Sequence, residues 1–327
     1  MSEADDRLPQ PLTNSWTPVL PPLEFAAWTE TRETLHLLCQ IVGKVRMALT
    51  PRRNHWWHVP FYVTPRGLTT GTLYEPNDPL LSLDIEIDLL EPGIEVRNNR
   101  GGMFDVAAPL DQMDCKWMFR EVTDAVSAAG VDVDLLGTPY DLPWCTTPFA
   151  QNEDRRTFDL GAAARYFRAL SWVERTFQEF RGDFLGKQTP VHMFWHSFDL
   201  ALTRFSGKAV DKKPSEFRNP RDAEAYSHEV ISFGFWPGDA NYPQAAFYSY
   251  TAPEPDGLAS EPLSAGGWFD VGGSHMARLD YAELRQAEDP RRMLLGFLES
   301  AYLAGAKRAG WDVEALRVPP EEYFETA

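Results

Sequence analysis

Apolar residues recur along most of the chain at spacings typical of helices and strands. Between Thr29 and Leu49 they return every three or four residues, which predicts an amphipathic helix that Pro51 ends. Between Leu81 and Leu89 they alternate with polar residues, which predicts a strand with one wet face. The same criteria predict helices over residues 116–129, 160–184 and 292–309, and strands over 56–64, 68–73, 94–97, 191–205, 227–236 and 245–250.

The first predicted helix also carries a polar stripe, formed by Arg32, His36, Gln40 and Lys44 at four-residue steps. A stripe of this kind is usually the solvated face of a helix, and that is the interpretation we favour. The alternative is the wall of a cleft that carries positive charge.

Several features occur twice in the same order, so we interpret the chain as one module written twice. Trp57-His58 is followed by Arg66, as Trp195-His196 is by Arg204, eight residues after the histidine in both cases. A Gly-Gly-aromatic-Asp-Val pattern follows in each half, as GGMFDV at 101–106 and GGWFDV at 266–271. Each half runs helix, strands, helix.

The predicted fold class is therefore α+β: two similar helix–strands–helix modules related by an approximate internal two-fold, with mainly antiparallel sheets and helices on the outer faces. The sequence leaves open whether the sheets join edge to edge or face one another. The predicted organisation is an extended N-terminal arm (1–26), a first module (27–136), a linker (137–158), a second module (159–318) and a C-terminal tail (319–327).

Composition narrows the possible partners and the compartment. The formal net charge of -17 disfavours nucleic acid and anionic membranes, whose phosphates such a surface repels. The three cysteines are widely spaced, which suits neither a disulfide framework nor a close-spaced zinc motif. The N-terminus is acidic and Pro-rich rather than that of a signal peptide, and no apolar run is long enough to span a bilayer. We therefore expect a cytoplasmic protein.

Four segments carry a resemblance to a known family: TLHLLCQIVGKVRMAL, HVPFYVTPRGLTTG, PVHMFWHSFDLALTRFSG and GGWFDV. They resemble a bacterial family catalogued only as a domain of unknown function, and the likeness runs from about Trp28 to Val318. The resemblance implies no activity. It does imply that the family does not require a histidine at the position of His196, which favours His192 as a catalytic residue.

The paired histidines and arginines suggest an anion site. If residues 191–205 form one strand, His196 and Arg204 lie on the same face, and His58 and Arg66 have the same spacing. Arginine would supply a fixed charge with paired donors, and histidine a proton acceptor near neutral pH. The alternative is repeated structural hydrogen bonding at strand ends.

A metal site is a second possibility. Four strand steps would separate His192 from His196 by roughly 13 Å, so these two residues would not share an ion. The residue types of a two-histidine, one-carboxylate iron site are nevertheless present in His192, His228 and Glu229, or with Asp199 as the carboxylate. We favour the absence of a cofactor and keep a non-haem metal as the alternative.

The favoured hypothesis is an enzyme that binds a small anionic molecule in an aromatic-lined cleft between the two modules. The absence of G-x-G-x-x-G, P-loop and G-x-S-x-G patterns disfavours nucleotide-dependent dehydrogenases, P-loop NTPases and α/β-hydrolases. The candidate catalytic residues are His192, His196, His58 and His228, and the candidate substrate-binding residues are Arg204, Arg66, Trp195, Trp57 and Asp199. The alternatives are the metal-dependent enzyme and a non-catalytic ligand-binding or scaffold protein. The oligomeric state is not predicted.

Overall fold

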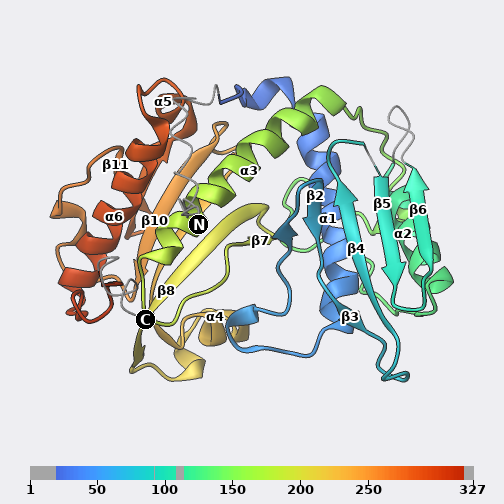
Figure 1. Ribbon diagram of the computed structural model, residues 1–327, viewed down its shortest axis with the longest axis horizontal. Coiled ribbons are helices and arrows are strands. Elements are labelled where there is room, and N and C mark those ends of the chain that lie inside the picture. The colour runs from blue at the N-terminus through green and yellow to red at the C-terminus, as the bar shows by residue number, and fades with distance from the viewer. Residues whose placement is uncertain (1–19, 92, 108–113, 320–327) are drawn as a thin grey trace, which may run out of the picture.

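The computed structural model describes residues 20–91, 93–107 and 114–319 (Figure 1). The α-helices of this part of the chain are α1 (Thr29–Leu49), α2 (Cys115–Ala128), α3 (Leu160–Gly182), α4 (Pro220–Ala225), α5 (Tyr281–Leu284) and α6 (Pro290–Arg308). The strands are β1 (Tyr62–Val63), β2 (Gly67–Thr69), β3 (Leu73–Tyr74), β4 (Ser82–Asp88), β5 (Gly93–Asn98), β6 (Met103–Ala107), β7 (His192–Phe194), β8 (Asp199–Ala209), β9 (His228–Trp236), β10 (Ala246–Ala252), β11 (Gly267–Val271) and β12 (Ser274–Asp280). Short 3-10 helices are η1 (Phe25–Ala27), η2 (Asn54–Trp56), η3 (Phe149–Gln151), η4 (Pro214–Glu216) and η5 (Leu258–Ser260).

The strands form two antiparallel sheets, which confirms the predicted α+β class. The first sheet has the order β1-β2-β4-β5-β6, with β3 paired to β4, and the second has the order β7-β8-β9-β10-β12-β11. Phe61 and Met193 exchange two backbone hydrogen bonds, each 2.8 Å long, between the facing edges of the sheets. The sheets therefore join edge to edge.

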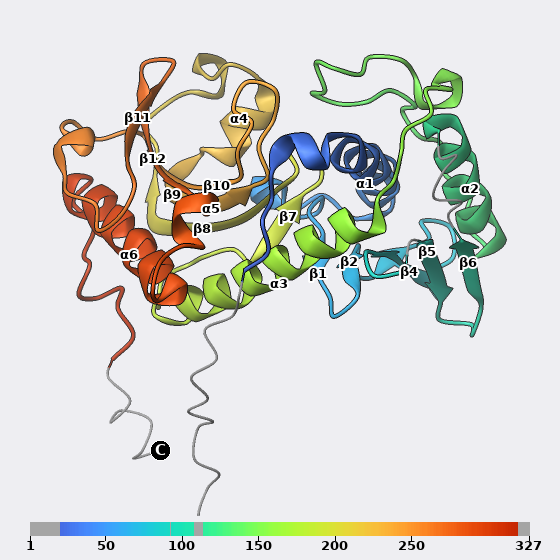
Figure 2. The same cartoon turned by 90° about the horizontal axis from the view of Figure 1, so that it is seen from above.

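The long helices cover opposite sides of the two sheets. Figure 2 shows α1 and α2 on one side of the first sheet, and α3 and α6 on the other side of the second. The face of the second sheet that α3 and α6 leave uncovered looks towards α1 and α4.

The helix α1 has the predicted bounds, but the interpretation of its polar stripe as a solvated face is wrong. The side chains of Arg32, His36, Gln40 and Lys44 are all buried. Gln40 holds both backbone groups of Tyr140, accepting from its N–H at 2.9 Å and donating to its carbonyl at 2.8 Å. Arg32, His36 and Gln40 bind backbone carbonyls of loops from the rest of the chain instead of water, which explains why this stripe is buried.

The single strand predicted over residues 191–205 is a hairpin. Strands β7 and β8 are antiparallel, and Phe194 pairs with Asp199 across a four-residue turn. This turn has no Gly, Pro or Asn to mark it; Phe198 itself adopts the left-handed conformation, with φ of 60°. The turn reverses the predicted faces, so that His192 shares a face with Asp199 and Arg204 lies on the other.

The expected internal two-fold is not confirmed. Most of the strand predicted over 56–64 is η2 and a turn, so Trp57-His58 precedes a sheet, whereas Trp195-His196 lies inside a hairpin. The two Gly-Gly patterns both lead into edge strands, but β6 pairs with the preceding strand and β11 with the following one.

The segment predicted as a linker is packed against the first half. Within residues 137–158, Phe149 is fully buried, and the carbonyl of Asn152 accepts from the N–H of Lys116 on α2 at 2.9 Å. In the predicted arm, the carbonyls of Leu20 and Pro21 accept from Arg285 and Tyr281. Residues 1–19 and 320–327 lie outside the described residues, and the division into modules stays a prediction.

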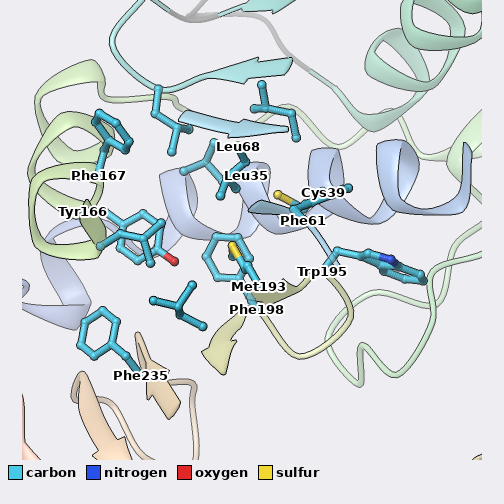
Figure 3. Packing of buried hydrophobic residues seen from close by; sticks show 14 of the residues in the cluster. Leu35, Cys39, Phe61, Leu68, Tyr166, Phe167, Met193, Trp195, Phe198 and Phe235 are labelled. Carbon is cyan, nitrogen blue, oxygen red and sulfur yellow. The ribbon is translucent and has the colours of Figure 1, made fainter. Parts of the chain in front are cut away.

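One apolar core runs across the junction of the sheets. Figure 3 shows Phe61, Met193 and Phe198 packed beside Leu35 and Cys39 of α1. Deleting a buried aromatic ring from such a core costs about 3–5 kcal/mol, so the halves stabilise one another. In the part of the chain that the structure describes, we find no helix with the length and apolarity needed to cross a membrane.

Candidate active site

A cavity of about 860 Å³ lies on the uncovered face of the second sheet. Alternate residues of β8, β9, β10 and β12 form its floor, and they face away from α3 and α6. The first half of the chain supplies the walls through the C-terminal part of α1, the loop around η2 and residues 136–141. This volume is typical of a binding site for a small organic molecule.

Aromatic side chains dominate the lining. They come from both halves of the chain: Trp56, Trp57, Tyr140, Phe194, Trp195, Phe205, Tyr226, Trp236, Tyr242, Tyr248 and Tyr250. Such rings bury a large apolar area, and the Tyr and Trp rings add hydrogen-bond donors at their edges.

Asp199 is the buried acid of the cavity. It is 7% exposed and accepts hydrogen bonds from the hydroxyls of Ser197 and Tyr248, one on each carboxylate oxygen. Tyr248 reaches it from β10 across β9, where Gly234 is its direct cross-strand partner. A Cβ at Gly234 would lie 2.2 Å from the Tyr248 ring, so only glycine at this position leaves space for the ring.

A second group of hydroxyls lies beside this acid. The phenols of Tyr226 and Tyr250 are 3.2 Å apart, and the hydroxyls of Thr203 and Ser232 are 2.7 Å apart. Burial raises the pKa of Tyr248 and of Tyr250 well above the usual range of a phenol. Both therefore stay protonated at neutral pH and can donate hydrogen bonds.

His192 lines the cavity in an unusual state. Its side chain is 1% exposed, and neither ring nitrogen has a hydrogen-bond partner among the described residues. Burial lowers its pKa to about 3, with a further contribution from the charge of Arg46. At neutral pH it is an uncharged imidazole whose donor and acceptor are both unused, which is rare for a buried polar group.

His196 also lines the cavity, in the turn between β7 and β8. Its carbonyl lies 3.0 Å from Nε2 of His36 on α1, which fixes the turn against the helix. Burial lowers the pKa of His196, and the negative charge of Asp199 works against that shift. The histidine and the acid therefore interact electrostatically.

Backbone strain is concentrated at this site. Four non-glycine residues in the described part of the chain have left-handed φ values between 55° and 60°: His55, Trp56, Asp141 and Phe198. The first three line the cavity, and Phe198 follows Ser197 in the turn that presents the acid. Left-handed non-glycine residues persist where the surroundings enforce them, and they cluster at functional sites.

The structure separates the expected histidine–arginine pairs. Arg66 is on the surface, where it pairs with Asp88 and Glu91, away from His58. Arg204 is 1% exposed on the opposite face of the second sheet, where it donates to the Phe180 carbonyl and lies 3.7 Å from the centre of that ring. The structure therefore brings neither histidine–arginine pair together.

Some of the other candidate residues line the cavity, and some lie outside it. Trp57 and Trp195 line the cavity with His192, His196 and Asp199, and the Trp195 ring lies flat on Gly43 of α1. His58 is buried outside the lining, where its Nδ1 accepts from the N–H of Arg53 at 3.3 Å and burial lowers its pKa.

The proposed metal ligands do not converge. His228 is outside the cavity lining, with Nδ1 3.1 Å from the Ser227 hydroxyl. Glu229 follows it on β9 and so faces the other side of the sheet. Within residues 20–91, 93–107 and 114–319, no three His, Cys, Asp or Glu side chains are grouped closely enough to hold a metal ion. The side chains of His192, His228 and Glu229 are therefore not grouped around one point in this structure.

Sequence analysis missed the tyrosines of β10 that complete the site. The alternation in A-F-Y-S-Y-T-A places Tyr248 and Tyr250 on one face of a strand, and this signal was available. What could not be derived was the cross-strand register that sets Tyr248 over Gly234. His55, Arg221 and Arg278 were missed because they come from segments without a regular pattern or from an unpredicted strand.

The chain belongs to a protein family described as a family of unknown function, DUF5996, whose model matches residues 20–318. This confirms the resemblance seen in the sequence. Searches of the curated proteins and of the solved structures found no match.

Proposed function

We propose that the protein is an enzyme that binds a small organic molecule in the junction cavity and exchanges a proton with it through His196 and Asp199. The observation that carries the proposal is the buried carboxylate of Asp199, held by two hydroxyls in an aromatic cavity of about 860 Å³. A concave apolar site with a few convergent polar groups is the usual form of a small-molecule site.

The two residues have complementary tasks in this proposal. His196 has a lowered pKa, so its imidazole is uncharged at neutral pH and can accept a proton from the bound molecule. The imidazolium that forms is then stabilised by the negative charge of Asp199. Tyr248 and Ser197 hold that carboxylate in place.

Binding can be tested with the neutral naphthalene dye prodan, whose emission shifts to the blue in apolar surroundings. We expect one molecule of dye per chain in the wild type and a loss of binding in Thr203→Trp, because Thr203 lies on the cavity floor. Thr72→Trp is the matched control, since Thr72 is exposed outside the cavity. Equal binding by all three proteins would place the dye elsewhere and contradict the proposal.

Catalysis needs a second experiment. The wild type and Asp199→Asn are incubated with a mixture of cellular metabolites, and the mixture is followed by mass spectrometry. We expect at least one compound to be consumed by the wild type, and about a hundredfold more slowly by the variant, as for loss of an acid–base group. Dye binding without any consumption would make the protein a non-catalytic binding protein and overturn the enzymatic part of the proposal.

A further inference from the structure

The charge of Asp199 is not balanced within the site. Burying a carboxylate without a positive partner is costly, and hydroxyl donors offset only part of that cost. Yet no Lys, Arg or His nitrogen among the described residues lies within 4.0 Å of its oxygens, and its hydrogen-bond donors, Ser197 and Tyr248, are neutral.

The basic side chains that line the cavity are engaged elsewhere. Arg221 lies 3.3 Å from Asp222 and donates to the phenol of Tyr140 at 2.6 Å. Arg278 lies over the rings of Phe269 and Tyr242, with its guanidinium carbon 3.6 Å and 4.0 Å from their centres.

Lys44, the remaining lysine or arginine of the lining, is 3% exposed, with its ammonium 5.9 Å from the centre of the Phe149 ring. Phe149 is itself outside the lining. None of the three basic groups pairs with Asp199.

The aromatic lining itself attracts positive charge. The faces of Trp, Tyr and Phe rings carry a negative partial charge, and they bind ammonium and guanidinium groups within about 6 Å. At the edge of this cavity they already do so: Lys187 lies 5.2 Å from the centre of the Trp57 ring and 5.5 Å from that of Phe205.

We infer that the molecule bound in the cavity is a protonated organic amine with an aromatic or apolar body, and that its ammonium group pairs with Asp199. The inference rests on the proposed function and names the class of its substrate. An ammonium would supply the positive partner that Asp199 lacks, and the rings of the lining would surround the apolar body. It replaces the anionic molecule expected from the sequence, for which Arg66 and Arg204 are misplaced.

The test compares three probes that differ mainly in charge: 2-(1-naphthyl)ethylamine, 2-(1-naphthyl)ethanol and 1-naphthylacetate. Each is titrated against the protein–prodan complex at neutral pH. We expect the amine to displace the dye about ten- to a hundredfold more tightly than the alcohol, as for a charge-assisted hydrogen bond, and the carboxylate to be the weakest.

Two variants assign the preference to one residue. Asp199→Asn is expected to bind the amine and the alcohol equally, because it keeps the shape of the side chain and removes its charge. Asp124→Asn is the matched control: it removes the same charge from an exposed position on α2, outside the cavity. This control should keep the preference for the amine.

The outcomes separate this inference from the function on which it rests. Equal displacement by amine and alcohol in the wild type overturns the inference and leaves the cavity function standing, and the wild-type comparison does not depend on any variant folding. A preference that survives in Asp199→Asn also overturns it. A wild type that binds neither prodan nor any probe contradicts the proposed function itself.

Discussion

At the scale of single residues, the site depends on a position without a side chain, Gly234, as much as on the side chains that line the cavity. Gly234 has no Cβ, so the Tyr248 ring crosses β9 and its phenol reaches Asp199. A glycine inside a strand usually weakens it, and here the ring of a neighbouring strand covers the gap.

The substitution Gly234→Ala should therefore disturb the site. The new methyl group would lie 2.2 Å from the Tyr248 ring, so the ring must move and lose its hydrogen bond to Asp199. We expect a loss of about 1–3 kcal/mol in the free energy of unfolding, as for other overpacked positions, measured by urea denaturation. Gly182→Ala in α3, where nothing lies within 4 Å, is the control and should not destabilise the protein.

The buried neutral histidines make stability dependent on pH. His36 and His192 both have a pKa of about 3 in the folded protein, because burial disfavours the charged imidazole. In the unfolded chain a histidine titrates near pH 6.5, so below that pH the unfolded state takes up protons that the folded state does not. Their contribution to stability is complete above about pH 6.5 and falls as the pH drops towards 3.

Each of these histidines should lower the free energy of unfolding by about 1.4 kcal/mol per pH unit in that range. At pH 5 the two together should cost about 4 kcal/mol relative to pH 7. The slope is measured by denaturant titration at pH values between 5 and 7. His192→Phe should remove half of their joint contribution, and a variant with the wild-type slope would show that His192 is not neutral in the folded protein.

At the scale of elements, α1 is the helix that brings the two halves together. Its apolar stripe packs in the core, and its polar stripe holds loops of the cavity wall, notably through the two hydrogen bonds between Gln40 and the backbone of Tyr140. Both stripes of α1 are buried, one apolar and one polar. In the sequence a buried polar stripe has the same pattern as a solvated one, so it was interpreted as solvated.

Removing the two hydrogen bonds between Gln40 and Tyr140 should make the cavity rim more mobile. Gln40→Ala leaves the N–H and the carbonyl of Tyr140 without their partner, and we expect a loss of about 2 kcal/mol or more in stability. Hydrogen exchange around residues 137–142 should speed up. Gln178→Ala on α3, an exposed residue whose amide bonds to Glu174, is the matched control and should change stability by less than about 0.5 kcal/mol. Unchanged exchange near Tyr140 would contradict this role of α1.

Regular elements were predictable from periodicity, and the turns that shape the site were not. The bounds of α1 and the alternation of β4 follow from repeated apolar positions that local physics enforces. The turn after Phe194 escaped prediction because Phe198 adopts a left-handed backbone that is costly without tertiary contacts, here stacking on His36 and Tyr166. One missed turn was enough to place Arg204 on the wrong face.

At the scale of the whole molecule, the cavity follows from how the sheets are joined. Their edges meet at Phe61 and Met193, and their helices lie on opposite sides, so one face of the second sheet stays open towards α1 (Figures 1 and 2). The sequence predicted an aromatic-lined cleft between the halves, and the structure has an aromatic cavity there. The residues expected to bind an anion were misplaced because long-range register is not encoded in local patterns.

A crystal structure of the protein grown with 2-(1-naphthyl)ethylamine tests the account most directly. The account predicts the naphthalene ring among the aromatic side chains of the junction cavity, with the ammonium nitrogen within hydrogen-bond distance of Asp199. An empty cavity with the amine ordered elsewhere, or an amine in the cavity that turns its nitrogen away from Asp199, would contradict it.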